Sequence, residues 1–427
     1  MDSPVYPIQI GTMVLAQAGI LALCLRFDLS RRLTLIPFAS LAALDYLFFM
    51  GLFPFIAHYR PLKQFQSSSM SVDTMVLIVM AQGLFFAGYF IALTWRNRHR
   101  PQHQDFTVGL PERLVGWAGL MAAFLFHFFP LLSSIPSLPQ LNRPLWLMGI
   151  AILTFALVNR QMGRWERVLF LLLLPLKLFM ELMSGYSSLF ILGCFTIIFV
   201  LFVKRSWYLL AGGGMVVFLT LASYIPVKKA YNWTMGYEVF SAGGVSNELS
   251  SVFDPIKNLD HVARRSTQGL LLQHVIAMTP SQIPYWQGST LLGVVTNSIP
   301  RAVWKEKPEE RLGNTFGQAY KILTPYDNVT SWNVPWLVEF YMNFGKIGAL
   351  GCMIVVGTAI GLLVRWIGRR PPAQQVGLAA AAIIPLFHPE SNVSLMLGNH
   401  LWIVLIIVSA FWLSHRVVAL ARGRISP

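Results

Sequence analysis

The sequence predicts an all-α, polytopic membrane protein with about eleven transmembrane helices and one large, partly helical external loop. Of the 427 residues, 55% are hydrophobic and only 12% are charged, about half the charged fraction of a soluble domain. Apolar stretches that approach the length of a membrane span recur along most of the chain. One polar interruption, at 226–335, separates a long N-terminal set of these stretches from a short C-terminal set.

Eleven stretches are candidates for the roughly 20 apolar residues that a transmembrane helix needs. They are 8–25, 33–55, 70–94, 114–129, 144–158, 168–183, 187–203, 207–224, 346–364, 376–387 and 400–413. The first is preceded by Met1-Asp2-Ser3, without the basic region of a signal peptide, so it is predicted to be a retained span.

The basic residues predict the orientation of these spans. Eighteen of the 33 Lys and Arg residues follow the odd-numbered spans, whereas the opposite short loops hold Arg60, Lys63 and Arg143. Loops rich in Lys and Arg stay in the cytoplasm. The N-terminus and the 226–335 loop are therefore predicted to be periplasmic, and the C-terminus cytoplasmic. The same rule explains the net charge of +15, so no nucleic-acid partner is expected.

Three regions follow from this layout: an N-terminal transmembrane bundle (1–225), a periplasmic loop (226–335), and C-terminal transmembrane helices with a basic cytoplasmic tail (336–427). The loop holds ten Lys or Arg and eight Asp or Glu, with aromatic residues throughout. A disordered segment is poor in aromatic residues, so this loop is predicted to fold. Apolar residues with roughly helical spacing at 271–278 predict an amphipathic helix lying on the membrane.

Two basic clusters in the loop are candidates for binding a phosphate-bearing substrate. They include Arg264, Arg265, Arg301, Lys305 and Lys307. Arginine binds phosphate through two parallel hydrogen bonds, and lysine adds a point charge. The alternative is a solvated surface, or contact with anionic lipid headgroups.

Lys177 and Glu181 are charged residues within the predicted span 168–183, four positions apart and therefore on one helix face. Charged groups inside a membrane are costly and commonly line a functional site, so both are candidate substrate-binding residues. An ion pair that only holds helices together is an equally open interpretation.

Three residues are candidates for the general base. Glu339 lies where the loop returns to the membrane, and His388 and Glu390 belong to a His-Pro-Glu turn between the last two predicted spans. Carboxylates at such positions also cap helices or pair with arginine. The loop contains no Asp-x-Asp or Glu-x-Asp pair, and the chain has no P-loop, Rossmann or HExxH motif. We therefore expect no metal and no cofactor.

Two runs in and after the loop carry a family resemblance. The run Ile299-Pro300-Arg301…Gly317, which reads IPRAVWKEKPEERLGNTFG, is followed by TSWNVPWLVEFYMNFGKIGALG from Thr330. Together they resemble the signature of bacterial oligosaccharide repeat-unit polymerases, the O-antigen and exopolysaccharide polymerases. The resemblance covers roughly residues 265–365.

This resemblance implies a glycosyltransferase of the bacterial inner membrane. Such an enzyme transfers a growing glycan from undecaprenyl pyrophosphate to an incoming lipid-linked repeat unit. Its partners are the lipid-linked donor and acceptor and the membrane, with a chain-length regulator as a further candidate. Trp286, Trp304 and Trp332 are candidates for stacking on sugars or for anchoring at the membrane interface. The alternatives are an O-antigen ligase and a transporter or flippase of lipid-linked sugars.

Overall fold

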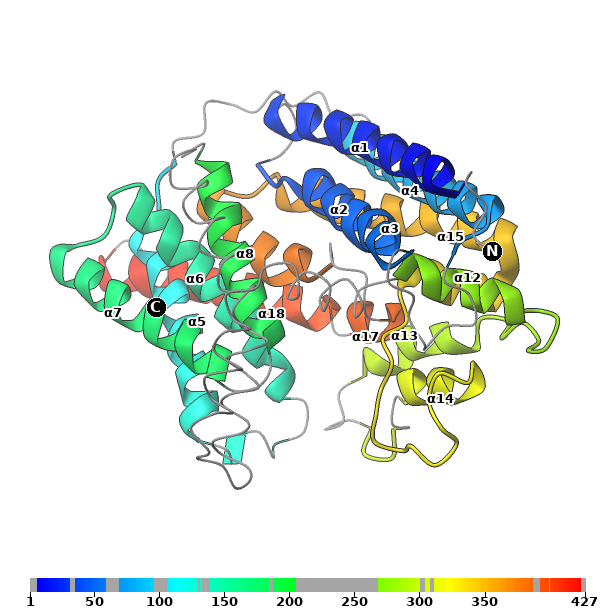
Figure 1. Cartoon of the computed structure of the whole chain (residues 1–427). Helices are drawn as coiled ribbons and strands as arrows, with labels where there is room; N and C mark the ends of the chain where they lie inside the picture. Colours follow the sequence, from blue (N-terminus) through cyan, green and yellow to red (C-terminus); the bar gives the residue numbers. More distant parts are fainter. Residues whose placement is uncertain are drawn as a thin grey trace, which may run out of the picture.

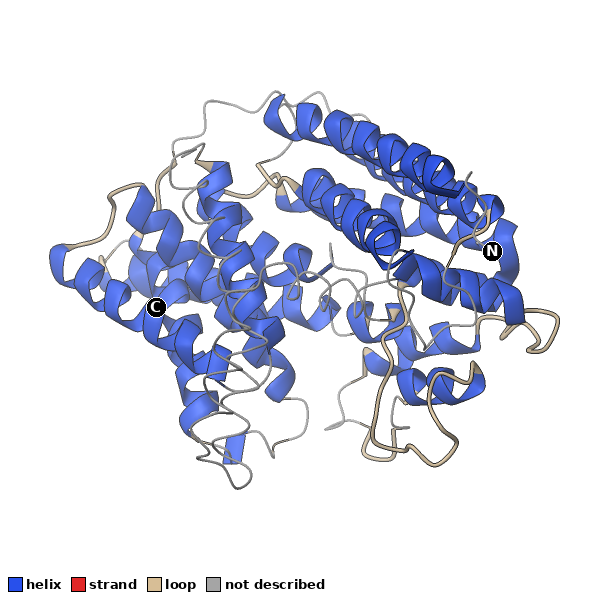
Figure 2. Ribbon diagram, viewed as in Figure 1, coloured by secondary structure: helices blue, strands red, loops and turns tan. Residues whose placement is uncertain are grey.

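The computed structural model describes residues 6–30, 35–58, 69–95, 106–129, 131–132, 135, 138–183, 187–204, 268–299, 304–307, 311–386, 392–398 and 400–423. Within these residues every regular element is helical, and Figure 2 shows helices and loops without a strand. The all-α prediction is confirmed for this part of the chain.

The helices follow one another as four groups. The first is α1 (Tyr6–Ser30), α2 (Phe38–Tyr46), η1 (Leu47–Leu52), α3 (Phe53–His58) and α4 (Val72–Thr94). The second is α5 (Leu110–Phe128), η3 (Pro139–Leu141), α6 (Asn142–Val158), α7 (Arg164–Met183) and α8 (Ser187–Val203). The third is α12 (Gln268–Met278), η4 (Ser289–Leu291), α13 (Leu292–Asn297) and α14 (Leu312–Ala319). The last is α15 (Trp336–Ile367), α16 (Pro372–Leu378), η5 (Ala379–Ile383), η6 (Ile384–Leu386), α17 (Val393–Leu397) and α18 (His400–Ala421).

Six helical segments in the described ranges are long and apolar enough to cross a membrane, which makes this a membrane-embedded protein. They are Tyr6–Ser30, Phe38–Ile56, Val72–Thr94, Pro139–Val158, Trp336–Ile367 and Val393–Ala421. The prediction of eleven spans was therefore too high. The predicted span 168–183 lies in α7, which carries too many charged residues for a membrane span. The predicted span 187–203 is α8, which has only 17 residues. The predicted span 376–387 falls in the short apolar helix Pro372–Leu386. The segment 114–129 lies in α5, which is not among the six, and 207–224 lies outside the described residues.

The first structural unit is built around the parallel pair α4 and α15. Gly88 of α4 lies against the backbone of Ile354, and Gly357 and Gly361 of α15 lie against the carbonyls of Phe85 and Tyr89. A Cβ atom at any of these glycines would lie closer to its neighbour than real Cβ atoms do. Small residues four positions apart let helix backbones approach closely in a membrane. α1, α2, α3 and α12 surround this pair (Figure 1).

The second unit is built around the antiparallel pair α5 and α6, with α7 and α8 beside it (Figure 1). A Cβ on Gly119 of α5 would lie 2.6 Å from the Leu145 carbonyl oxygen, and a Cβ on Gly149 of α6 would lie 2.7 Å from the Leu120 nitrogen. α6 is the most enclosed helix of this unit, because nearly all residues from Trp146 to Ala156 are buried.

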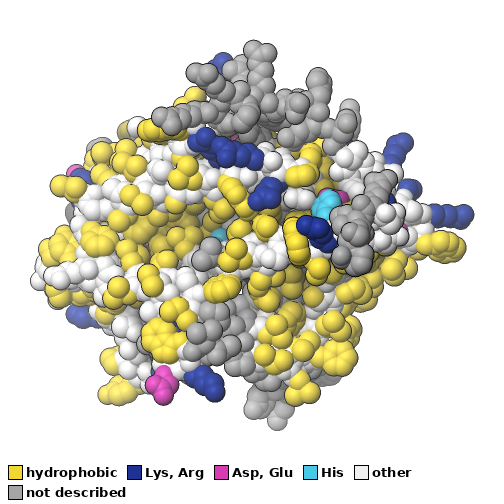
Figure 3. Space-filling model, turned by 180° about the vertical axis from the view of Figure 1, so that it is seen from behind, with side chains coloured by type: hydrophobic (Ala, Val, Ile, Leu, Met, Phe, Trp, Pro, Cys, Tyr) yellow, Lys and Arg dark blue, Asp and Glu magenta, His cyan; other side chains and the backbone are white. Residues whose placement is uncertain are grey.

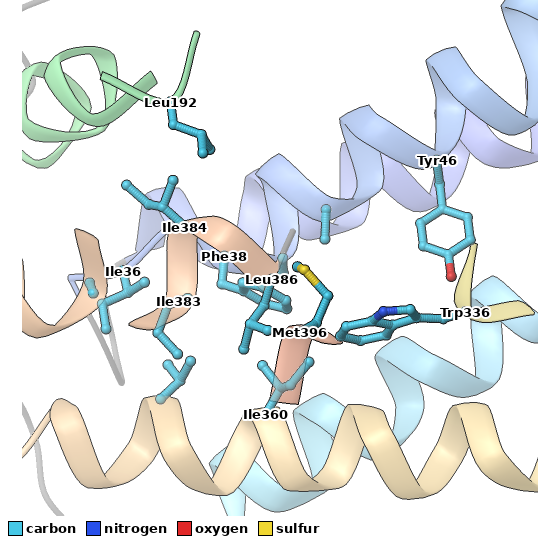
Figure 4. Packing of buried hydrophobic residues seen from close by; sticks show 14 of the residues in the cluster. Ile36, Phe38, Tyr46, Leu192, Trp336, Ile360, Ile383, Ile384, Leu386 and Met396 are labelled. Carbon is cyan, nitrogen blue, oxygen red and sulfur yellow. The ribbon is translucent and has the colours of Figure 1, made fainter. Parts of the chain in front are cut away.

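The segments from α16 to α18 join the two units. Figure 4 shows Ile384 and Leu386 of η6 and Met396 of α17 between Leu192 of α8 on one side and Trp336 of α15 on the other. The starts of α4 and α15 lie at one end of the bundle because the two helices are parallel. This end, called the α15 end below, also holds the start of α17, where Val393 is bonded to Glu339.

The helix predicted at 271–278 exists as α12, but it does not lie on the outside of the bundle. Leu270, Leu271, Leu272, Val275 and Met278 are all buried, and α12 packs against α15, α4 and η1. It is apolar on more than one face, which is typical of a helix enclosed by others. By contrast, the face drawn in Figure 3 is largely hydrophobic, as expected of a surface that contacts lipid.

Candidate functional site

Glu339 lies in the first turn of α15, at the α15 end of the bundle. Its side chain is fully buried, because the same turn also buries Trp336, Leu337 and Val338. Pro335 precedes the helix in an extended conformation and sets its start. A carboxylate buried in this way needs hydrogen-bond donors to offset the loss of water.

Two segments far away in the sequence supply these donors. The hydroxyl of Thr290, in η4, donates to Glu339 Oε1 at 2.7 Å. The backbone N–H of Val393, the first residue of α17, donates to Oε2 at 2.6 Å. The N–H groups in the first turn of a helix have no partner within the helix, and an acidic side chain is a favourable acceptor for them. Glu339 therefore joins three segments: α15, the stretch before α13, and α17.

Asn343 extends the same arrangement by one helical turn. Its Nδ2 donates to the Thr290 hydroxyl at 2.8 Å and to the Glu339 carbonyl at 2.7 Å, and its Oδ1 accepts from the N–H of Gly288 at 2.8 Å. Thr290 thus accepts a hydrogen bond from Asn343 and donates one to Glu339. We call Gly288, Thr290, Glu339, Asn343 and Val393 the Glu339 cluster.

A break in α15 at Gly345 adds hydrogen bonds between α15 and the segment before η4. Gly345 has φ 68° and ψ −169°, a conformation that is essentially restricted to glycine. The break leaves the carbonyls of Met342 and Asn343 free to accept from the N–H groups of Trp286 and Gln287, at 3.0 and 3.2 Å. A helix that continued regularly through Gly345 would use these carbonyls itself.

Two roles are open to the Glu339 carboxylate: it can hold backbone segments together, or it can accept a proton as a general base. Both carboxylate oxygens of Glu339 already accept a hydrogen bond, and the side chain is fully enclosed. A general base must reach the hydroxyl that it deprotonates. The geometry therefore favours a positioning role, and the role of Glu339 as a base stays a prediction.

The basic run 301–307 is described from Trp304 to Lys307, together with Ser298 and Ile299 just before it. Trp402 Nε1 of α18 donates to the carbonyl of Ser298. Lys307 is buried, and its Nζ donates to the Ile299 carbonyl at 3.2 Å. Lys305 and Trp304 are exposed. Of the two predicted phosphate-binding lysines, Lys307 therefore closes the loop while Lys305 faces outward.

Five predicted site residues cannot be placed. Arg264, Arg265, Arg301, His388 and Glu390 lie outside the described residues. Their predicted roles in substrate binding and catalysis stay predictions.

Lys177 and Glu181 form the predicted i, i+4 ion pair, with 2.5 Å between Nζ and Oε1. Both side chains are buried, and Lys177 Nζ lies 5.8 Å from the ring centroids of Phe124 and Trp146. The pair thus connects α7 to α5 and α6, away from the Glu339 cluster. Removing one member of a buried pair leaves the other charge uncompensated.

The sequence singled out Glu339 but not the residues that bind it. Asn343 carried a detectable signal, because it follows Glu339 by four positions and so lies on the same helix face. Thr290 and Val393 carried none, because they are 49 and 54 positions away from Glu339.

Comparison with known proteins identifies a family but no function. No curated protein matches the chain, and no solved structure does. The model of a family described as a domain of unknown function, DUF8712, matches residues 38–370. The match runs from the start of α2 to just past α15 and includes Thr290, Glu339 and Asn343. Because it spans well over half of the chain, this protein belongs to the DUF8712 family.

Proposed function

We propose that this protein is a membrane glycosyltransferase that joins lipid-linked oligosaccharide repeat units into a surface polysaccharide at the periplasmic face of the bacterial inner membrane. One observation carries the proposal. The two runs that resemble repeat-unit polymerases are in direct contact: the N–H of Trp332 donates to the Gly313 carbonyl at 3.1 Å, and Asn314 Nδ2 donates to the Thr330 carbonyl at 2.9 Å.

The contacts at the α15 end add support. Ser298, which directly precedes the first run, accepts a hydrogen bond from Trp402 of α18, and Glu339 of the second run accepts one from Val393 of α17. α13, which leads into the first run, packs closely on α17, because a Cβ on Gly293 would lie 2.7 Å from that of Ser394. Both runs therefore adjoin the same short helix.

The proposed reaction is a substitution at the anomeric carbon of the donor glycan. The oxygen of an acceptor hydroxyl forms the new bond to that carbon, and the carbon–oxygen bond to the lipid pyrophosphate breaks. The proton of the hydroxyl passes to a base, for which Glu339, His388 and Glu390 are the candidates. Lys305 and Arg301 are the candidates for neutralising the departing pyrophosphate, and the exposed Trp304 is the candidate for stacking on a sugar.

The test is turnover by purified protein in liposomes that contain lipid-linked repeat units. A ladder of products that differ by one repeat unit is expected in mass spectra. Arg301→Ala should remove the ladder, whereas Arg416→Gln, an exposed residue near the end of α18, should leave it intact. Transfer to a different lipid acceptor would indicate a ligase, and movement of substrate across the bilayer without a new bond would indicate a flippase. Either outcome rejects the polymerase.

Turnover should continue in excess EDTA, because the sequence lacks the paired carboxylates that commonly hold a catalytic metal in glycosyltransferases, and cationic side chains take over charge neutralisation. Activity that is lost in EDTA and restored by Mg²⁺ or Mn²⁺ would contradict this expectation.

The proposed orientation can be tested with cysteines in a background where Cys24, Cys194 and Cys352 are alanine. Val329 is 96% exposed in the loop after α14, and Trp165 is 80% exposed at the start of α7. An impermeant maleimide should label Val329→Cys in intact spheroplasts and Trp165→Cys only after lysis. The reverse pattern would place the loop in the cytoplasm.

A further inference from the structure

Asp28 is a buried acidic residue in the last turn of α1, with only 4% of its surface exposed. Its Oδ2 accepts two hydrogen bonds from Ser40 in the first turn of α2, from the backbone N–H at 2.8 Å and from the hydroxyl at 2.6 Å. This contact joins α1 to the start of α2, where the N–H groups lack partners within the helix. The contact uses one oxygen only. Oδ1 is also buried, and it has no hydrogen-bond partner in the described part of the chain.

The hydroxyl of Tyr89, on α4, is a second buried polar group at the same place. Tyr89 is fully buried, and its hydroxyl forms no hydrogen bond among the described residues. Ring contacts place it beside Asp28. The ring of Phe27, the preceding residue, has its centroid 4.5 Å from that of Phe90, and the ring of Phe38, in the first turn of α2, is 5.4 Å from that of Tyr89. Asp28 is also close enough to act electrostatically on the Tyr89 hydroxyl. α1, α2 and α4 therefore meet around two unsatisfied oxygens (Figure 1).

The protein supplies no positive charge for Asp28. Two other buried acidic residues have partners: Glu181 pairs with Lys177, and both oxygens of Glu339 accept hydrogen bonds. Within the described ranges, Asp28 forms no ion pair with Lys, Arg or His. A buried carboxylate with an unsatisfied oxygen and no opposite charge is costly, so it favours a bound cation.

The position of Asp28 and Tyr89 near the ends of two helices also favours positive charge. Asp28 lies in the last turn of α1, and Tyr89 lies five residues before the end of α4 at Thr94. The end of a helix carries a partial negative charge, and neither helix has a basic residue in its last turn. Arg365 of α15 donates to the Ala92 carbonyl of α4 at 3.4 Å but forms no ion pair with Asp28.

The chemistry favours a monovalent metal ion over the alternatives. Water suits a neutral group such as the unsatisfied amide of Gln82, but it leaves the charge of Asp28 uncompensated. A proton on Oδ1 would be a buried donor without an acceptor, because the Tyr89 hydroxyl is not within hydrogen-bond distance. A divalent ion prefers more carboxylates, and the described residues contain no group of three His, Cys, Asp or Glu that could hold one.

We propose that Asp28 and Tyr89 bind one Na⁺ ion where α1, α2 and α4 meet. The carboxylate Oδ1 balances the charge of the ion, and the Tyr89 hydroxyl is a second oxygen ligand, as a hard cation prefers. Because Asp28 also binds Ser40, the ion connects the three helices. The site lies at the opposite end of α4 from the α15 end, so it is separate from the Glu339 cluster. It stands whether or not the chain joins sugars.

The first experiment measures binding of ²²Na⁺ to the full chain in maltoside micelles by scintillation proximity, with choline as the balancing cation. Saturable binding of about one ion per chain is expected, with displacement by unlabelled Na⁺ and not by choline. Displacement by K⁺ as well would support a site for either monovalent metal ion. Absence of saturable binding would overturn the proposal and leave water or a proton as the occupant.

Variants then assign the binding to this site. Asp28→Asn should abolish it, because the amide keeps an acceptor for Ser40 but loses the charge. The matched control is Asp73→Asn, which removes an exposed carboxylate in the first turn of α4 and should bind Na⁺ like wild type. Wild-type binding in Asp28→Asn would reject the site, and so would an equal loss in both variants.

Tyr89→Phe keeps the ring that packs on Phe38 but lacks the hydroxyl, so it should lower the affinity for Na⁺ about threefold. If Asp28→Asn does not yield monodisperse protein, thermal unfolding decides the question. Replacing choline by Na⁺ at constant ionic strength should raise the Tm of wild type, since the ion binds only the folded state. The increase should be smaller in Tyr89→Phe and unchanged in Asp73→Asn. An equal increase in wild type and Tyr89→Phe would reject the site.

Discussion

The Glu339 cluster and Arg143, in the first turn of α6, differ in how far the protein satisfies their polar atoms. Both oxygens of the Glu339 carboxylate accept hydrogen bonds from the protein's own chain. The guanidinium of Arg143 has a buried nitrogen without a partner in the described ranges. Both residues are charged, and both belong to the first turn of a long helix.

The difference separates a residue that joins segments of the protein from one whose buried nitrogen lacks an acceptor in the described ranges. A buried group whose hydrogen bonds are made internally stabilises the fold. A buried polar atom without such a bond destabilises it. The two regions should therefore respond to mutation in opposite directions.

The largest effect should follow from removing the Glu339 carboxylate. Glu339→Ala leaves the Val393 N–H and the Thr290 hydroxyl without an acceptor and should lower the free energy of unfolding by about 3 kcal/mol. Thermal unfolding in detergent measures this as a decrease in Tm. Glu339→Gln retains one acceptor oxygen and should lie between Ala and wild type. An unchanged Tm for Glu339→Ala would show that Glu339 has no structural role.

The break at Gly345 should be nearly as sensitive. Gly345→Ala forces a side chain into a conformation with φ 68° and places a Cβ 2.9 Å from the hydroxyl of Tyr285. We expect a loss of about 2 kcal/mol, of which the backbone strain is the larger part. Adding Tyr285→Phe removes the hydroxyl and should restore a minor part of the stability. Full recovery in the double variant would show that the clash, and not the backbone, sets the cost.

Replacing Arg143 should have the opposite sign. Arg143→Met removes a half-buried charge whose Nε has no partner in the described ranges, and it keeps an unbranched, apolar side chain. The protein should therefore become more stable by about 1 kcal/mol. The check is an increase in Tm. A decrease in Tm as large as that of Glu339→Ala would remove the distinction between the two regions.

The smallest effect concerns Asp327, whose carboxylate is bonded like that of Glu339 but lies in solvent. Its Oδ1 accepts from the N–H groups of Thr330 and Val329, at 2.8 and 3.1 Å. The hydrogen bonds from Thr330 lower the pKa of Asp327 below its ordinary value of 3.8. A lowered pKa in the folded state means that this contribution is present above the unfolded value and is lost as pH falls through the folded value.

Hydrogen–deuterium exchange of the 324–332 peptide checks this expectation. After correction for the intrinsic exchange rate, Asp327→Asn should exchange a few times faster than wild type above pH 5. The difference should shrink as pH falls through the lowered folded-state pKa of Asp327, because the carboxylate then becomes protonated. Tm should not change, since the turn is solvated. A change in Tm comparable to that of Glu339→Ala would mean that burial does not set the importance of such bonds.

The sequence predicted the helical class and several local features. The Lys177–Glu181 ion pair was one of two interpretations of these residues, because four-residue spacing determines which side chains meet on a helix; their role in substrate binding stays a prediction. Helix α12 was predicted from its periodicity, but its burial was not, since the covering residues come from α4 and α15. The number of spans was overestimated because hydropathy alone does not separate a membrane span from a short apolar helix such as Pro372–Leu386.

The site was predictable only where it is local. Glu339, Asn343 and Gly345 stand in one short run, whereas their partners Thr290 and Val393 depend on long-range packing. Arg143 was counted in the sequence as a charge on a short loop. Its buried nitrogen without a partner becomes visible only from the packing around the start of α6.

The close contact between α4 and α15 also has a consequence for biosynthesis. α4 ends at Thr94 and α15 begins at Trp336, so about 240 residues are translated between them, which takes ~12–48 s at 5–20 residues per second. During this interval the face of α4 that contains Gly88 is in the membrane before its partner α15 has been made. α1, which contacts α4 and is made earlier, can hold it in place while the insertion machinery works through the second unit. The close contact between α4 and α15 can therefore form only after the second unit has been synthesised.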